Sequence, residues 1–287
     1  LMHTVHLEEG VDAYTVLEPD RIPALGWLLA AFIAVVLMVG GWTGLRGLIA
    51  LTISILTVFY VLLPALQAGY DPFLTCFGVA AIIVLVSSYL THGINRATSA
   101  AVVGLLATVG ITTVVAHYAI AATRLSGFSD EGSVALHFAS NGSIDFVGLL
   151  LGAMLVGARG ILYDAAIGQA VAVDELLRAA PNMGHTRLFA RAMRIGREHI
   201  GALVNTLAVA YVGVALPLLL LFQSYGEASF FEVVNREAFA TEIVRALVGS
   251  IGIVLTVPVT TAVAIFLLTR VSRTSATIKN DEKRHHH

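Results

Sequence analysis

The sequence contains little charge. Asp, Glu, Lys and Arg make up 13% of its 287 residues, about half the usual share of a soluble domain, whereas 57% of the residues are hydrophobic. A water-soluble globule of this length could not bury so much apolar surface. The formal net charge of −2 indicates neither nucleic-acid binding nor a bulk acidic partner. We therefore expect an integral membrane protein whose surroundings are the lipid bilayer, with no nucleic-acid partner.

Cysteine is almost missing as well. The single Cys76 lies inside an apolar run, which excludes an intrachain disulfide and a cysteine-based zinc site and predicts a small buried side chain. The histidines show no metal-ligand spacing, and the sequence has no phosphate-binding loop, dinucleotide fingerprint, nucleophile elbow or zinc-protease helix. We expect no cofactor, no metal site and no enzymatic activity, and ATP-driven transport by this chain alone is disfavoured.

Long apolar runs dominate what is present. A hydrocarbon core of about 30 Å is crossed by about 20 apolar residues in a helix. Such runs occur at about 24–40, 47–66, 74–91, 98–122, 146–170, 200–222 and 246–269. The sequence therefore predicts an all-α fold, a polytopic bundle of about seven transmembrane helices over residues 24–269. Residues 1–23 form an extracytoplasmic tail, and residues 270–287 form a cytoplasmic tail that ends in the remnant of a purification tag.

The distribution of basic residues predicts the orientation. If the first helix runs from outside to inside, twelve Lys and Arg residues lie on inner segments and four on outer ones. Basic residues gather on the cytoplasmic side, so we expect the N-terminus outside and the C-terminus inside. Because residues 1–23 contain no signal-peptide core, we also expect the full-length protein to begin with a further membrane segment or a cleaved signal.

One connection has a helical pattern of its own. In 184–199, Leu188, Phe189, Ala192 and Met193 mark an apolar face opposite four arginines. The pattern predicts a helix lying on the anionic inner leaflet. A solvated charged face explains it equally well.

The run 146–170 differs from the others because it contains charge. Glycines recur at spacings of three to five, which lets a neighbouring helix approach closely. Arg159 and Asp164 lie in its inner half, where charges are expected to face protein or water and to be paired. Their spacing of five does not favour a mutual salt bridge, so we expect each to find a partner elsewhere. Asp164 is either a carboxyl group that binds and releases a proton or cation, or a structural acid that pins helices together.

The other polar residues of the bundle are candidates for supporting contacts. The next span offers His199, Asn205 and Thr206 as partners of the charged residues. We expect Arg159 to act as a counter-charge or carbonyl-binding group and Gln169 to make a polar contact between helices. His199, at the predicted inner surface, is equally compatible with an ordinary solvated residue.

A set of motifs resembles the YibE/F family of bacterial multi-spanning membrane proteins. The resemblance covers about residues 14–269 and implies a location in the bacterial inner membrane. The motifs are 157–164 (GARGILYD), 169–176 (QAVAVDEL), 194–201 (RIGREHIG), 204–207 (VNTL), 242–252 (EIVRALVGSIG) and 89–93 (YLTHG). One difference is Tyr163, which precedes Asp164 where family members carry a second acid.

A second resemblance concerns 146–222 alone. The segment begins with a glycine-rich helix that carries an intramembrane acid and has Glu175 at its inner end. A basic connector and a helix with Thr and Pro follow. This order is similar to the membrane core of resistance-nodulation-division permeases and the SecD/SecF translocation factors. This likeness implies that Asp164 is the ion-coupling group and that Asn205 or Thr206 is its neighbour. It also implies that the last five helices share that arrangement.

Three functions remain open at this point. The leading expectation is a proton- or sodium-coupled transporter of unknown substrate, acting alone or as a homo-oligomer. The second is an ion-coupled accessory subunit that acts on an extracytoplasmic partner, as a translocation factor does. The third is a scaffold that transports nothing.

Overall fold

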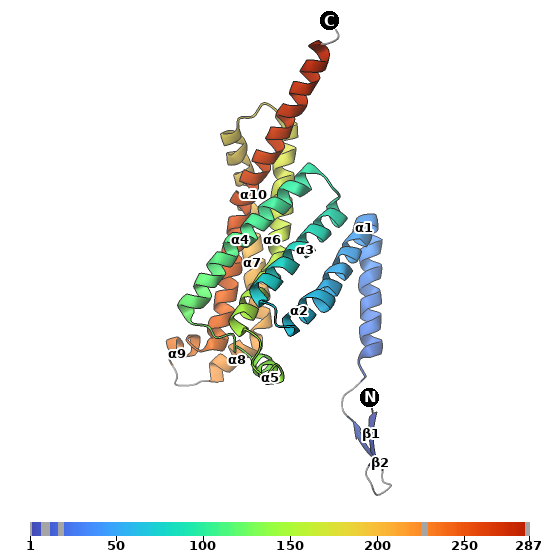
Figure 1. The fold of residues 1–287 in the computed structure, drawn as a ribbon, viewed down its shortest axis with the longest axis vertical. Helices are drawn as coiled ribbons and strands as arrows, with labels where there is room; N and C mark the ends of the chain where they lie inside the picture. Colours follow the sequence, from blue (N-terminus) through green and yellow to red (C-terminus); the bar gives the residue numbers. More distant parts are fainter. Residues whose placement is uncertain (1, 7–11, 17–19, 225–228, 285–287) are drawn as a thin grey trace. The chain divides into compact units, whose positions relative to one another are not determined.

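The computed structural model describes residues 2–6, 12–16, 20–224 and 229–284 (Figure 1). Side chains are described from Asp20 to Phe222 and from Ser229 to Thr269. The elements are strands β1 (Met2–His6) and β2 (Asp12–Val16), α1 (Ile22–Thr57), a π-helical segment (Val58–Leu62), α2 (Leu63–Gln67), α3 (Pro72–His92), α4 (Arg96–Thr123), α5 (Glu131–Ala139), α6 (Phe146–Ala179), α7 (His185–Val214), α8 (Leu216–Ser224), α9 (Phe230–Val234) and α10 (Glu237–Arg284). The tail predicted at 270–287 thus continues α10 to Arg284, and residues 285–287 lie outside the described part.

The chain divides into two compact units, residues 1–52 and 53–287. In the first unit β1 and β2 pair antiparallel, with Met2 opposite Val16. The helix that follows bends sharply at Gly41, whose φ of 53° and ψ of −134° are not helical. A Cβ at Gly44 would approach the carbonyl oxygen of Val36, so only glycine fits here. The bend lies where the sequence predicted the break between its first two spans.

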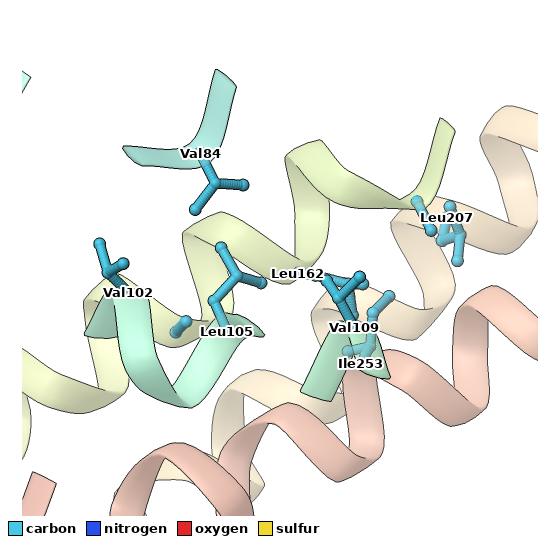
Figure 2. Close-up of a cluster of buried hydrophobic side chains, with 9 residues drawn as sticks. Val84, Val102, Leu105, Val109, Leu162, Leu207 and Ile253 are labelled. Atoms are coloured by element: carbon cyan, nitrogen blue, oxygen red, sulfur yellow. The ribbon is translucent and has the colours of Figure 1, made fainter. Parts of the chain in front are cut away.

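The second unit is a bundle built mainly from α3, α4, α6, α7 and α10 (Figure 1). Short helices α5, α8 and α9 lie at one end of it, called the α9 end below. The connection between α6 and α7, which contains Pro181, lies at the other end, called the Pro181 end. Figure 2 shows the central apolar cluster, in which Leu105 of α4, Leu162 of α6 and Ile253 of α10 meet.

Side-chain caps fix the starts of three long helices. The Asp71 side chain accepts a hydrogen bond from the Leu74 amide (2.7 Å), and the Asn95 side chain accepts one from the Thr98 amide (2.8 Å). Asp145 caps α6 through the Val147 amide (3.0 Å). Each cap satisfies an amide that has no partner within the first turn.

The seam between α4 and α10 has the same pattern on both helices. A glycine is followed by threonines four and eight residues later: Gly104, Thr108 and Thr112 on α4, and Gly252, Thr256 and Thr260 on α10. A Cβ at Gly104 would lie 2.9 Å from the Thr260 Cα, and one at Gly252 would lie 2.9 Å from the Thr112 Oγ1. Thr108 and Thr256 each donate to the carbonyl of their own helix's glycine (2.8 and 2.9 Å). Lipid supplies no hydrophobic drive for helix association, so this close approach stabilises the pair by direct packing.

A second glycine seam joins α3 and α6. A Cβ at Gly152 would collide with the Cys76 side chain, and one at Gly148 would lie 3.3 Å from the Pro72 Cβ. Cys76 is a free thiol with 2% of its surface exposed, which confirms the prediction of a small buried side chain.

Five helices are long and apolar enough to cross a membrane, or six if the bent pair α7–α8 counts as one span. This count concerns the described residues and takes Ile22–Gln67 as one helix of 46 residues. At 1.5 Å per residue that helix would be about 69 Å long, more than twice the hydrocarbon thickness. The structure confirms the prediction of an all-α bundle with helices suited to a membrane. The predicted count of seven transmembrane helices stays a prediction.

One predicted boundary is wrong. Residues 185–199 do not form a separate helix on a leaflet but continue directly into α7. Leu188 and Ala192 are fully buried in a cluster with Val173 of α6 and Ala264 of α10. This part of the apolar face packs on protein, whereas Phe189 is exposed. The arginines at 187, 191, 194 and 197 are exposed.

Candidate functional site

Asp164 lies on the exposed face of α6, in a row of glycines. Gly157, Gly160 and Gly168 are exposed like Asp164 itself, and their spacing places all four on one side of the helix. A Cβ at Gly160 or Gly168 would meet no atom within 4 Å. The acid therefore projects from a stretch of helix that carries almost no side chains on this side.

A cavity of about 280 Å³ lies beside Asp164, between three helices. It is lined by Asp164, Ala165, Gly168 and Gln169 of α6, Ile195, His199 and Leu203 of α7, and Val257 of α10. Val257 lies at the middle of the apolar run 246–269. Asp164 and Gln169 lie in the second half of the run 146–170. The cavity thus lies between the middle of the bundle and its Pro181 end, and its apolar wall surrounds three polar side chains.

Gln169 holds the three helices of the cavity together. Its Nε2 donates to the Ala192 carbonyl of α7 (2.9 Å) and to the Thr261 Oγ1 of α10 (2.7 Å). Thr261 in turn donates to the Val257 carbonyl (2.7 Å). Gly196 makes room for this contact, because a Cβ there would lie 2.7 Å from the Gln169 Oε1 and would collide with Val257.

His199 offers a base to the cavity. Its Nδ1 lies 3.1 Å from the Ile195 carbonyl oxygen. A carbonyl oxygen only accepts, so this contact requires the proton on Nδ1 and leaves the Nε2 lone pair available in the neutral ring.

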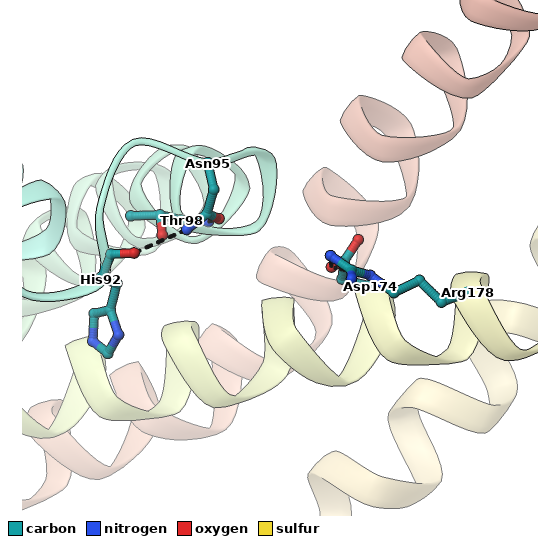
Figure 3. Close-up of polar contacts among 5 residues, drawn as sticks. All are labelled: His92, Asn95, Thr98, Asp174 and Arg178. Carbon is teal, nitrogen blue, oxygen red and sulfur yellow. Dashed lines mark hydrogen bonds and ion pairs between the residues drawn. The ribbon is translucent and has the colours of Figure 1, made fainter.

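His92, the last residue of α3, approaches Asp164 from another side. Its ring interacts electrostatically with the Asp164 carboxylate, and its centroid lies 6.1 Å from that of Tyr163. Figure 3 shows the His92 ring directed toward α6, while the Asn95 side chain donates to the His92 carbonyl (3.0 Å) and caps α4 at Thr98. Two imidazoles, from α3 and α7, therefore accompany one carboxylate of α6.

The ion pairs predicted for Arg159 and Asp164 are not present. Among the described residues neither side chain belongs to an ion pair; the recorded pairs join Arg178 to Asp174 (2.7 Å) and Arg245 to Glu242 (3.4 Å). Arg159 is half-buried and interacts electrostatically with Tyr163. Asp164 is consequently free of a permanent counter-charge in the described part of the chain.

The structure does not bring the other predicted residues to Asp164. Asn205 and Thr206 are exposed and do not line the cavity, and the Thr206 hydroxyl donates to the Ala202 carbonyl of its own helix (2.9 Å). Glu175 is exposed three turns further along α6, near the Asp174–Arg178 pair that Figure 3 also shows. His199 and Leu203, rather than Asn205 and Thr206, are the neighbours on α7.

Sequence reasoning missed the part played by His92. No spacing rule links residues 92 and 164, which meet only because α3 packs along α6. The signal available was the motif 89–93, which contains His92. No group of three or more His, Cys, Asp or Glu suited to a metal ion occurs among the described residues.

The side chains of this site are a carboxylate and two imidazoles, groups that can bind and release a proton. The cavity offers few oxygen ligands for a cation besides Asp164 and Gln169, fewer than the six or more that a hard metal ion such as calcium takes.

Comparison with known proteins agrees with the motifs. No curated protein and no solved structure matches the chain. The family model described as YibE/F-like protein matches residues 28–270, most of the sequence. The chain therefore belongs to the YibE/F family.

Proposed function

We propose that this protein is an ion-coupled membrane transporter in which Asp164 binds and releases the coupling ion. The observation that carries the proposal is the placement of Asp164: a carboxylate without an ion pair among the described residues, beside a cavity between α6, α7 and α10. An intramembrane acid is costly to keep. A site that leaves it without a counter-charge supports a role in which its charge changes.

The packing supports the same role. Gln169 ties α6 to α7 and α10 at the wall of the cavity, so a change of charge at Asp164 acts on a junction of three helices. Coupling requires that binding at one group biases the arrangement of the elements around it.

The membrane orientation belongs to the proposal. We place the Pro181 end in the cytoplasm of a bacterial cell and the α9 end outside, because the exposed arginines of α7 lie near the Pro181 end. In this orientation Asp164 lies toward the inner side of α6.

The test is an Asp164→Asn variant in proteoliposomes with an internal pH-sensitive dye. An imposed gradient of protons, with and without sodium, drives flux through the wild type, and the variant is expected to lose it because an amide cannot exchange a proton or balance a cation. Asp71→Asn is the matched control, since Asn caps a helix as well as Asp does. Flux through Asp164→Asn equal to that of the wild type would refute the proposal.

A further inference from the structure

A second group of titratable side chains lies along the same three helices, toward the α9 end. It consists of Tyr211 of α7 with Glu242 and Arg245 of α10. Arg245 and Glu242 form an ion pair of 3.4 Å with side chains 26% and 28% exposed. The half-buried Tyr211 hydroxyl interacts electrostatically with both. The functional site described above uses none of these residues.

One polar atom of this group lacks a partner. The Nε of Arg245 is buried and makes no hydrogen bond among the described residues. A buried donor of this kind costs free energy unless an acceptor such as water reaches it. The charged pair thus leaves one buried donor without an acceptor among the described residues.

The Tyr211 hydroxyl lies where α6 and α10 both carry glycine. It would be 3.8 Å from a Cβ at Gly157 and 3.9 Å from one at Gly249. Gly157 is the first member of the exposed row that continues through Gly160 to Asp164. At 1.5 Å per residue, about 10 Å of helix separate Gly157 from Asp164.

The charges facing this route come from each of the three helices. Asp164 belongs to α6, Tyr211 to α7, and Glu242 and Arg245 to α10. Arg159 lies on the opposite side of α6 from the glycine row, near Tyr163. His199 and Asp164 follow at the cavity. Polar groups thus lie at both ends of the exposed Gly157–Gly160 stretch of α6.

We propose that Glu242, Arg245 and Tyr211 form the outer mouth of a proton path that leads along the Gly157–Gly160 face of α6 to Asp164. A proton from the outer water binds the Glu242 carboxylate and releases Arg245 from its pair. The proton then passes by way of the Tyr211 hydroxyl and water over the bare glycines to the Asp164 carboxylate, and Glu242 returns to its ionised form. This inference rests on the proposed function and names the proton as the coupling ion.

The first test measures water access and does not depend on transport. Gly157→Cys and Gly160→Cys, in a Cys76→Ala background, are treated on intact cells with a membrane-impermeant maleimide. Both sites leave room for a Cβ, and a thiol reacts as the thiolate, which forms only in contact with water. Val114→Cys on the exposed side of α4 is the control. Labelling of the two glycine positions well above that of Val114→Cys supports the path, and equal labelling overturns it.

The second test measures proton flux driven from the outer side in proteoliposomes. Glu242→Gln and Tyr211→Phe are expected to slow it by about tenfold or more, as loss of a positioned proton-transfer group does, while Glu242→Asp retains most of it. Glu131→Gln, an exposed acid of α5, serves as the matched control.

The two proposals fail in different ways. Wild-type flux in Glu242→Gln and Tyr211→Phe, with loss of flux in Asp164→Asn, would overturn the outer path and leave the transport proposal standing. Labelling of Gly157→Cys together with wild-type flux in Asp164→Asn would refute the transport proposal instead.

Discussion

At the scale of residues, Gln169 and Gly196 set the distances between α6, α7 and α10 at the cavity wall. Gln169 is 4% exposed and has both its donors engaged, one on a backbone carbonyl and one on a hydroxyl. Gly196 faces its oxygen at a distance that no side chain could occupy. The Gln169 amide of α6 and the lack of a side chain at Gly196 of α7 therefore together form the contact between these two helices.

Gly196→Ala is predicted to lower the free energy of unfolding by about 1–3 kcal/mol, the usual cost of forcing an extra methyl into a packed interior. The new Cβ would collide with Val257 and press on Gln169. Gly201→Ala on the same helix meets nothing within 4 Å and is expected to be neutral or to stabilise by up to about 1 kcal/mol. Denaturant titration in detergent measures both, and equal stability of the two variants would contradict the contact.

Gln169→Leu is predicted to lower the free energy of unfolding by about 1–2 kcal/mol, because the Ala192 carbonyl loses its side-chain donor inside the bundle. Thr206→Val removes a hydroxyl that bonds only its own helix on an exposed face. This control is expected to change stability by less than about 0.5 kcal/mol. A Gln169→Leu variant as stable as Thr206→Val would show that the contact between helices contributes nothing.

At the scale of elements, the seam between α4 and α10 is a close approach in which both helices carry the same pattern of glycine and threonine. Gly104 meets the backbone of Thr260, and Gly252 meets the hydroxyl of Thr112. The two contacts correspond because the helices run antiparallel, so each glycine faces the last threonine of the opposite motif. Shifting one helix by a residue would break both contacts at once.

Gly104→Ala is therefore predicted to destabilise the protein by about 1–3 kcal/mol, because its Cβ would lie 2.9 Å from a backbone atom that cannot rotate away. Gly110→Ala on the same helix has open space and serves as the control. Thermal unfolding of the two variants in one detergent distinguishes them. A smaller loss in Gly104→Ala than in Gly110→Ala would show that the seam is loose.

The apolar runs of the sequence predicted the positions of the long helices well, but they predicted the ends of these helices less well. The run 146–170 marks what can lie in lipid, but α6 continues to Ala179 because Asp174, Glu175 and Arg178 extend a helix in water as readily. Leu188 and Ala192 misled the prediction for 185–199, since an apolar face fits a protein groove as well as a leaflet. Charge inside an apolar run identified Asp164. His92 lies in the motif 89–93, but its nearness to Asp164 follows only from the packing of α3 on α6.

For the whole molecule, the orientation rests on basic residues and is open to direct measurement. In a Cys76→Ala background, we predict that Glu131→Cys reacts with a membrane-impermeant thiol reagent on intact cells and that His185→Cys reacts only after permeabilisation. Both positions are exposed and lie in the helices α5 and α7. The reverse pattern of labelling would invert the topology and with it the direction of the proposed ion path.

The matched motifs of α4 and α10 have a mechanical consequence for any transport cycle. Because α4 and α10 are in close contact at Gly104 and Gly252, they are expected to move as one rigid body. Neither helix can slide along the other unless the two first separate. α7 meets α10 at Gly249, where a Cβ would lie 2.9 Å from the Leu207 side chain. Beyond this contact Val212 and Val214 are exposed, and a bend of 67° leads into α8. We therefore expect any displacement that follows a change of charge at Asp164 to be larger at the C-terminal end of α7, beyond Tyr211, than between α4 and α10.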